Sequence, residues 1–159
     1  MTIKVGDQIP EATLAVMEDG APKKVSTAEL FDGKRVALFA VPGAFTPTCS
    51  QTHLPGFVAN ADKLKAKGID SIICLSVNDV FVMDAWGKAQ NAEHLVMTAD
   101  GNAAFTEAAG MIFDLTAHGL GVRSQRYSMI VDDGVVEALN LDAPGQFEVS
   151  GAEQILEAL

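Results

Sequence analysis

The chain contains 159 residues, 48% of them hydrophobic, and its formal net charge at pH 7 is −10. This size is typical of one domain that buries its core without disulfide support, so we expect a single domain over residues 1–159. The 21 acidic residues outnumber the 11 basic ones and no run of lysine or arginine occurs, which argues against binding to nucleic acid or to anionic membrane surfaces.

The sequence shows no signal for export or membrane insertion. Residues 1–7 lack an apolar signal segment, and no uninterrupted apolar stretch approaches the roughly 20 residues that span a bilayer. The two cysteines, Cys49 and Cys74, do not form a Cys-x-x-Cys pattern, which is typical of a reducing compartment where thiols serve chemistry or packing. We therefore expect a cytoplasmic protein.

The N-terminal part of the chain predicts a hairpin, a short helix and a buried strand. Residues 12–17 are expected to form a strand that turns back at residues 18–22, where Asp-Gly and proline occur. Ser26 and Glu29 have the spacing of a capping box, which begins a helix of one or two turns. Residues 35–41 are a continuous apolar run, which indicates a strand buried on both faces and hence a parallel sheet.

The segment after this strand combines a helix start with a cysteine. Pro47 suits the first turn of a helix, because its missing N–H has no partner there, and Thr46 before it is a competent cap. Cys49 therefore falls in the first helical turn, where free backbone N–H groups and the helix dipole favour a thiolate over a thiol. We expect Pro55 to kink this helix and Lys67-Gly68 to end it. The position of Cys49 is typical of a nucleophile.

The rest of the chain alternates strands and helices and ends in a hairpin and a helix. Residues 110–122 show no steady period and are expected to form a loop. Asp132-Asp133-Gly134 is expected to be a three-residue connection in a bulged hairpin, and Ser150 with Glu153 has the spacing of a second capping box. The predicted strands are 69–77, 94–99, 127–131 and 135–140, and the predicted helices are 80–91, 103–109 and 150–159. This order predicts an α/β fold with a mixed central sheet flanked by helices.

Two stretches of the sequence resemble a known family. The pattern Pro42-x-x-x-Thr46-x-x-Cys49 resembles the active-site motif of the peroxiredoxins, and the string from Pro42 to Ser50 resembles their type-five branch, also called type II. Residues 119–128 resemble the segment in which that branch carries its active-site arginine. The resemblance covers most of the chain, from residue 5 to residue 141, and implies a thioredoxin-like fold.

This resemblance implies a thiol-dependent peroxidase that reduces hydrogen peroxide and small alkyl hydroperoxides. Cys49 would be the peroxidatic cysteine, Thr46 would donate to the sulfur or to the peroxide oxygen, and Pro42 would shield the sulfur from water. Arg126, the arginine just before an aromatic residue, would stabilise the thiolate and the departing oxygen, with Arg123 as indirect support. No cofactor is implied, and the histidines and acids show no metal-binding spacing.

The sequence leaves the recycling of the oxidised cysteine open. Cys74 lies in an apolar run, where a cysteine is usually part of the core, but its place also resembles that of a candidate resolving cysteine in plant and bacterial type-II members. Residues 141–150 contain no cysteine, which rules out the internal disulfide of the animal branch. We expect glutathione, glutaredoxin or thioredoxin to reduce oxidised Cys49, directly or after a Cys49–Cys74 bridge.

The resemblance also implies a homodimer. The loop around Phe45 and residues 78–86 and 115–120 would form the contact, because apolar groups in predicted loops commonly mark interfaces.

The residues also suggest two functions other than a peroxidase. His53 stands one helical turn after Cys49, so the pair could act as a Cys-His hydrolase, although this spacing also suits a surface or packing histidine. A non-enzymatic thioredoxin-fold scaffold is the other alternative. The presence of Thr46, Cys49 and Arg126 together argues against a scaffold, which needs none of them.

Overall fold

Strand β3 (Arg35–Val41) lies at the centre of the structure, and both of its faces are covered. Residues 36–41 are almost fully buried. The side chains alternate between two hydrophobic cores, as the two-residue period of a strand requires. β3 pairs in parallel with β4 (Ser71–Ser76) and antiparallel with β8 (Tyr127–Asp132), so the sheet is mixed, as predicted.

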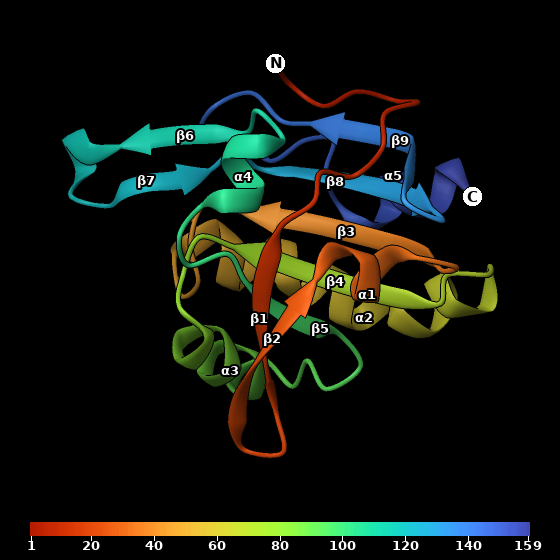
Figure 1. Cartoon of the computed structure of the whole chain (residues 1–159), viewed down its shortest axis with the longest axis horizontal. Coiled ribbons are helices and arrows are strands. Elements are labelled where there is room, and N and C mark those ends of the chain that lie inside the picture. Colours follow the sequence, from red (N-terminus) through yellow and green to blue (C-terminus); the bar gives the residue numbers. More distant parts are fainter.

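The computed structural model describes all 159 residues and contains a seven-stranded sheet in the order β2-β1-β5-β4-β3-β8-β9 (Figure 1). A separate two-stranded sheet, β6 with β7, projects from one end of it. The remaining strands are β1 (Thr13–Glu18), β2 (Ala21–Ser26), β5 (Val96–Ala99), β6 (Ile112–Leu115), β7 (Gly121–Ser124) and β9 (Val135–Leu141). The helices are α1 (Thr27–Phe31), η1 (Cys49–His53), α2 (Leu54–Ala66), α3 (Val80–Ala89), α4 (Ala104–Ala108), η2 (Thr116–His118) and α5 (Ala152–Ala158).

Helices cover both faces of the large sheet. The core on one face takes its helical side chains from α2, α3 and α5, among them Phe57, Trp86 and Ile155. The core on the other face is closed by α1 and α4 through Phe31 and Phe105. This arrangement is a thioredoxin-like α/β fold with a mixed central sheet flanked by helices, as expected.

Several local predictions are confirmed. β1 and β2 form the N-terminal hairpin. Ser26 and Glu29 form both hydrogen bonds of the capping box of α1. Helix α3 begins at Val80, as predicted, and Asp79 caps it by accepting from the N–H of Val82. α2 ends before Gly68, whose φ of +98° is accessible to glycine at little cost.

The prediction that residues 110–122 form a loop was wrong. This stretch contains β6, the 3₁₀ turn η2 and the first residues of β7, which together form an antiparallel hairpin. Its two strands have only four residues each, and the hairpin belongs to neither main core. Strands this short and this exposed contain too few alternating apolar and polar positions for the two-residue period of a strand to be recognised in the sequence.

Two predictions about the C-terminal region were also wrong. The connection between β8 and β9 has two residues, Asp133 and Gly134, both with positive φ, and the register shift lies inside the strands at Ile130/Val131. Ser150 does not cap α5; the cap residue is Gly151. The hydroxyl of Ser150 is instead buried and donates to the carboxylate of Asp142.

No helix in the molecule is long and apolar enough to cross a membrane.

Candidate active site

Cys49 lies where the chain leaves the central strand and enters a helix. After β3, the residues 42–46 bend across the end of the sheet, and the N–H of Ala44 donates to Asn78 Oδ1 at 2.9 Å. Helical hydrogen bonding begins with the N–H of Ser50, which donates to the carbonyl of Thr46 at 2.9 Å. Cys49 is therefore in the first turn, as predicted, and its side chain is fully buried.

This first turn is wider than the ordinary α-helical turn that the sequence predicts. η1 is a π-helix, and the N–H of Leu54 donates to the carbonyl of Cys49, five residues back. Pro55 follows directly in the first turn of α2, where its missing N–H would interrupt an α-helical ladder. The sequence predicts a kink at Pro55, and the structure shows a change from π-helical to α-helical hydrogen bonding around this residue.

Helix α3 holds the wide turn through Ser50. The indole N–H of Trp86 donates to Ser50 Oγ at 3.0 Å, and Gln90 Nε2 donates to the Ser50 carbonyl at 3.1 Å. Trp86 is itself fully buried, so its position is fixed by the core. The residue next to the reactive sulfur is therefore anchored to a second helix.

A chain of hydrogen bonds extends from the sulfur into the protein. Arg126, immediately before β8, donates from Nη2 to Cys49 Sγ at 3.0 Å. Its Nη1 donates to His53 Nδ1 at 2.8 Å, which fixes the tautomer with the proton on Nε2. That Nε2–H donates to the carbonyl of Ser150 at 2.9 Å. The guanidinium thus has two fixed partners, and its positive charge faces the sulfur.

His53 is an uncharged member of this chain. Burial, and next the positive charge of Arg126, lower the pKa of His53 from 6.5 to about 3. The ring also packs between Phe57 and Phe147, with centroid distances of 5.7 and 4.7 Å. Both ring nitrogens are occupied, so neither is free to take the proton of Cys49. The arrangement does not support the Cys-His hydrolase; His53 packs in the core and orients Arg126.

The hydroxyl of Thr46 does not donate a hydrogen bond to the sulfur of Cys49. Its hydroxyl donates to the carbonyl of Gly43 at 2.6 Å, so the oxygen is left as an acceptor. This differs from the expectation that Thr46 donates to sulfur or peroxide. A hydroperoxide has one O–H group, and the hydroxyl oxygen of Thr46 can accept a hydrogen bond from it.

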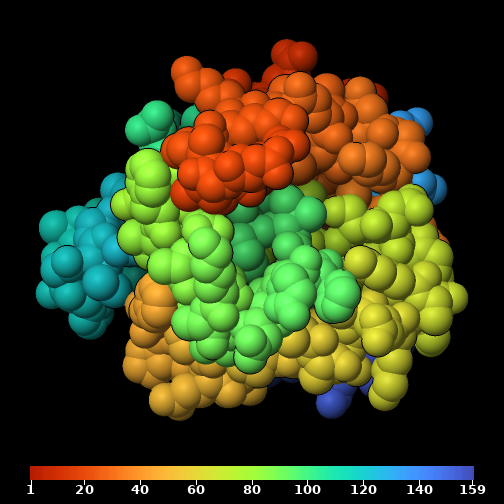
Figure 2. All heavy atoms as spheres, turned by 90° about the horizontal axis from the view of Figure 1, so that it is seen from below, coloured from red at the N-terminus to blue at the C-terminus, as the bar shows by residue number.

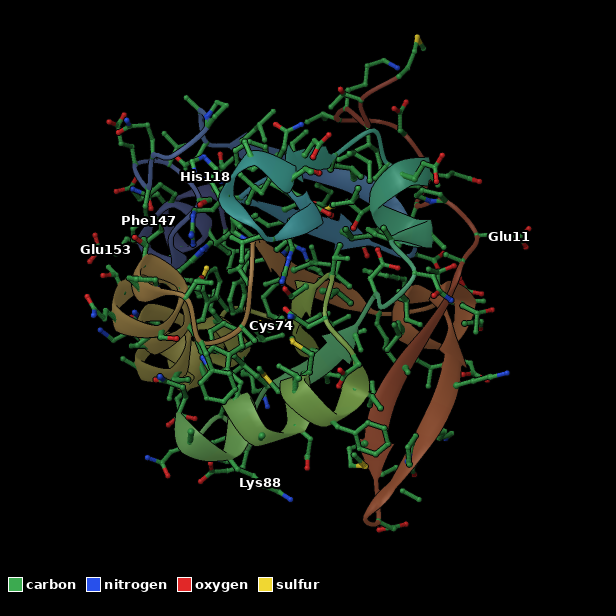
Figure 3. The ribbon with its side chains drawn as sticks, turned by 90° about the vertical axis from the view of Figure 1, so that its left-hand side faces the viewer. Glu11, Cys74, Lys88, His118, Phe147 and Glu153 are labelled. Carbon is green, nitrogen blue, oxygen red and sulfur yellow. The ribbon has the colours of Figure 1, made fainter.

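A pocket of about 270 Å³ lies beside Arg126, the residue that donates to the buried sulfur. Pro42, Thr48 and Arg126 line it together with residues of the β6–η2–β7 hairpin, Gln125 and the segment after β9. Apolar Phe113 and Leu115 face polar groups that include His118. Figure 3 shows His118 and Phe147 on the same side of the molecule.

Arg123 has a different place from the one expected. Its Nε donates to the carbonyl of Leu120 at 2.9 Å, and its Nη1 to the carbonyl of Val77 at 3.3 Å. The guanidinium also packs against Gly43, where an added Cβ would lie 3.1 Å from Nη1. Arg123 therefore links the β6–β7 hairpin to the loop before Cys49. It makes no hydrogen bond to Arg126 or to the sulfur.

Cys74 lies in the middle of β4, between Phe39 on β3 and Met97 on β5. It is fully buried beside α3, as Figure 3 shows, and burial raises the pKa of this thiol well above its ordinary value of 9.0. Both cysteines are free thiols in this structure. The resolving role of Cys74 remains a prediction.

Several residues around the sulfur were not found by sequence reasoning. Asp142 and Phe147 carry no motif, and the capping-box spacing of Ser150 does not indicate that this distant segment folds beside Cys49. Ser50 adjoins Cys49, but the sequence does not indicate its anchor on Trp86. The structure brings no three histidine, cysteine or acidic residues together as a metal site.

Comparisons with known proteins agree with this geometry. The Redoxin family model matches residues 4–156. "Peroxiredoxin-2E-2, chloroplastic" of Oryza sativa subsp. japonica is 52% identical over 99% of this chain and 73% of its own length. "Peroxiredoxin-2D" of Arabidopsis thaliana is 48% identical over 99% of this chain and 98% of its own length. The reduced Prx3 of Vibrio vulnificus in complex with H₂O₂ superposes with a TM-score of 0.96, at 56% identity and 99% coverage of both chains.

Fold and site together define a thiol-dependent peroxidase on a thioredoxin-like scaffold. The chain belongs to the peroxiredoxin family, whose members are oxidoreductases acting on peroxide, and Cys49 is its peroxidatic cysteine. A non-enzymatic scaffold is not supported.

Substitution of the arginine tests its assignment. Arg126→Lys should lower the second-order rate with peroxide on the order of 10²-fold, because an ammonium cannot replace two fixed guanidinium donors. Arg126→Met should be slower still, since it also removes the charge that favours the thiolate. Stopped-flow oxidation measures all of these rates.

Arg123→Lys is the matched control. Arg123→Lys weakens the contacts of Arg123 with the carbonyls of Leu120 and Val77 but leaves the hydrogen bond from Arg126 to Cys49 Sγ in place. The rate with peroxide should therefore fall much less than in Arg126→Lys. A larger loss in the Arg123 variant than in the Arg126 variant would show that the wrong arginine has been assigned.

The uncharged state of His53 predicts a pH dependence of stability. Between pH 6.5 and about 3 the unfolded chain binds a proton at His53 and the folded chain does not. The free energy of unfolding should therefore fall as the pH drops through this window, by at most about 1.4 kcal/mol per pH unit from this residue. Denaturant unfolding of His53→Gln should show a shallower pH dependence than the wild type.

His94→Gln, which changes an exposed histidine outside the site, is the control and should keep the wild-type pH dependence. Equal slopes for wild type and His53→Gln would mean that folded His53 binds a proton, contrary to its place beside Arg126.

Proposed function

We propose that this protein is a type-II peroxiredoxin that reduces hydrogen peroxide and small alkyl hydroperoxides and is recycled by external thiols. The observation that carries the proposal is the 3.0 Å hydrogen bond to Cys49 Sγ from Nη2 of Arg126, a residue that also lines the pocket. The similarity to the plant proteins named Peroxiredoxin-2E-2 and Peroxiredoxin-2D supports the branch, and the similarity to the hydrogen peroxide complex from Vibrio vulnificus supports the substrate. Recycling by glutathione, glutaredoxin or thioredoxin needs a reducing compartment, so we also propose the cytoplasm as its location.

The first half of the reaction is the attack of the Cys49 thiolate on one peroxide oxygen. As the S–O bond forms, the O–O bond breaks, and the other oxygen leaves as hydroxide or alkoxide and then takes up a proton. Sulfur loses two electrons and becomes a sulfenic acid. Arg126 faces both charged states, the thiolate at the start and the departing oxygen at the end.

The shape of the pocket supports small hydroperoxides as substrates. Its volume of about 270 Å³ leaves room for a short alkyl group, and Phe113 and Leu115 offer apolar contact to it. Cys49 is fully buried and does not itself line the pocket, so a bulky hydroperoxide cannot bring its O–O bond to the sulfur without displacing the residues that do.

The second half of the reaction needs an external thiol. It attacks the sulfenic sulfur, water leaves, and a second thiol breaks the resulting mixed disulfide to restore Cys49. Because Cys49 is fully buried, the wide turn η1 must open for a tripeptide or a protein to reach it. Cys74 is likewise fully buried, in the middle of β4, so a bridge between the two cysteines also depends on the opening of η1.

Recycling is tested with coupled assays. Cys74→Ser should keep most of the turnover with glutathione and glutaredoxin, because an external thiol can reduce Cys49 without a second cysteine. Cys49→Ser should consume no peroxide. Thioredoxin is tried in a separate assay. If folded Cys74→Ser loses nearly all turnover with both reductants, Cys74 is an obligatory resolving thiol and direct reduction is excluded.

We further propose a homodimer whose contact surface includes exposed apolar side chains near the site. Phe45, Phe81 and Leu120 are 55%, 63% and 37% exposed. Arg123 connects their loops by bonding the carbonyls of Leu120 and Val77 beside Gly43. Figure 2 shows the β6–β7 hairpin in cyan, the start of α3 in yellow-green and the turn before Cys49 in orange side by side.

Sedimentation at micromolar concentration should show a dimer, and Phe81→Asp should shift it towards monomer because a charge would be buried in the contact. Val149→Asp changes another exposed apolar residue, outside this patch, and should leave the dimer intact. A wild-type protein that sediments as a single 16.7 kDa species would contradict the proposal.

A further inference from the structure

The segment between β9 and α5 is folded around one carboxylate. Asp142 Oδ1 accepts from the N–H groups of Glu148 and Val149 at 2.8 and 2.9 Å. Its Oδ2 accepts from the N–H of Ser150 at 3.2 Å and from the hydroxyl of the same residue. The segment contains no helix or strand, so these four hydrogen bonds are its main internal support. Asp142 is only 3% exposed.

Asp142 is connected to Arg126 in two ways. Its own N–H donates to the carbonyl of Arg126 at 3.0 Å. Its carboxylate fixes Ser150, whose carbonyl accepts from His53 Nε2, and His53 Nδ1 accepts from Arg126 Nη1. Together these contacts form a closed ring that begins at the main chain of Arg126 and returns to its guanidinium.

The same segment also encloses the charged group from the outside. The Phe147 ring lies 4.7 Å from the His53 ring and 5.8 Å from the Arg126 guanidinium carbon. Residues 142–146 form one wall of the pocket. Substrate entering the pocket therefore meets the segment whose position decides where Ser150 and Phe147 lie.

We propose that Asp142 is a positioning residue for peroxide reduction, which acts through Ser150 and His53 to hold the guanidinium of Arg126 on the Cys49 sulfur. The proposal rests on the peroxidase function of Cys49 and adds a residue that contacts neither the sulfur nor the Arg126 side chain. The titratable groups around the sulfur are Arg126 from just before β8, His53 from its own helix and Cys74 from β4.

Replacing the carboxylate of Asp142 by an amide should disturb the hydrogen bond from Arg126 to the Cys49 sulfur. Asparagine has the same shape, but its NH₂ group would face either the Ser150 donors or those of residues 148–149, donor against donor. The Ser150 carbonyl would then lose its fixed place, and the Nε2–H of His53 would lose its acceptor. A free imidazole no longer holds Nη1 of Arg126, and Nη2 is released from the sulfur.

The test uses a Cys74→Ser background, in which Cys49 is the only cysteine, so that thiolate ultraviolet absorbance reports on one sulfur. In this background Asp142→Asn should lower the second-order rate with hydrogen peroxide by about tenfold or more, as small misplacements of catalytic groups do. The thiolate absorbance near neutral pH should fall as well. Loss of stability alone would not change the absorbance of the folded protein.

Asp100→Asn is the matched control. Asp100 is another buried carboxylate that accepts three hydrogen bonds, from the N–H groups of Phe105 and Thr106 and from the Thr106 hydroxyl. It has no hydrogen bond to Cys49, His53 or Arg126. This variant should lose stability but keep both the peroxide rate and the thiolate absorbance.

A double substitution tests the route through His53. His53→Leu removes both hydrogen bonds of the ring, so adding Asp142→Asn should cost little more, whereas two independent effects would multiply. His53→Gln, which can accept from Arg126 and donate to Ser150, should recover part of the rate lost in His53→Leu.

The proposal is overturned if folded Asp142→Asn keeps the peroxide rate and the thiolate absorbance of its background within twofold. If Asp142→Asn does not fold, Ser150→Ala removes a single hydrogen bond to the carboxylate, and unchanged values there overturn the proposal equally. A background protein that reacts with no peroxide would refute the proposed substrate; the thiolate absorbance would still decide whether Asp142 positions Arg126.

Discussion

The contact on which this site depends is the hydrogen bond from the Arg126 guanidinium to the Cys49 sulfur. It joins two segments far apart in the chain, the helix start after β3 and the residue before β8, which meet because β3 and β8 are neighbours in the sheet. The antiparallel register of these strands sets where Arg126 lies relative to the end of β3. The reactivity of Cys49 therefore depends on the pairing of β3 with β8 as well as on the position of Cys49 in its own helix.

Much of the fold and part of the site could be predicted from the sequence because the signals are local. The apolar run of β3, the capping box at Ser26 and the Pro47-x-Cys49 helix start each lie within a few residues. These signals place the reactive cysteine in its helical turn without any knowledge of tertiary contacts. The family motif adds Arg126, which pattern reasoning alone could not have connected to a cysteine so distant in sequence.

What could not be predicted depends on contacts between distant segments or on short elements. The β6–β7 hairpin has strands of four residues, too short to show a period. The π-helical turn directly precedes Pro55 and is anchored through Ser50 to Trp86, and nothing near Ser50 in the sequence indicates that anchor. Ser150 looked like a helix cap because its spacing to Glu153 is correct, but the buried carboxylate of Asp142 is the stronger partner for its hydroxyl.

The uncharged state of His53 has a consequence for the charge balance of the catalytic cycle. With His53 neutral, the guanidinium of Arg126 and the thiolate of Cys49 cancel before the reaction. When the sulfur becomes a sulfenic acid, the negative charge leaves with the departing oxygen, and the guanidinium of Arg126 loses its anionic partner. The carboxylate of Asp142 also lines the pocket, but its oxygens accept from residues 148–150 and not from the guanidinium. In a protein with a net charge of −10, oxidation of Cys49 therefore removes one negative charge from beside Arg126 and leaves Asp142 as the acidic residue of the pocket.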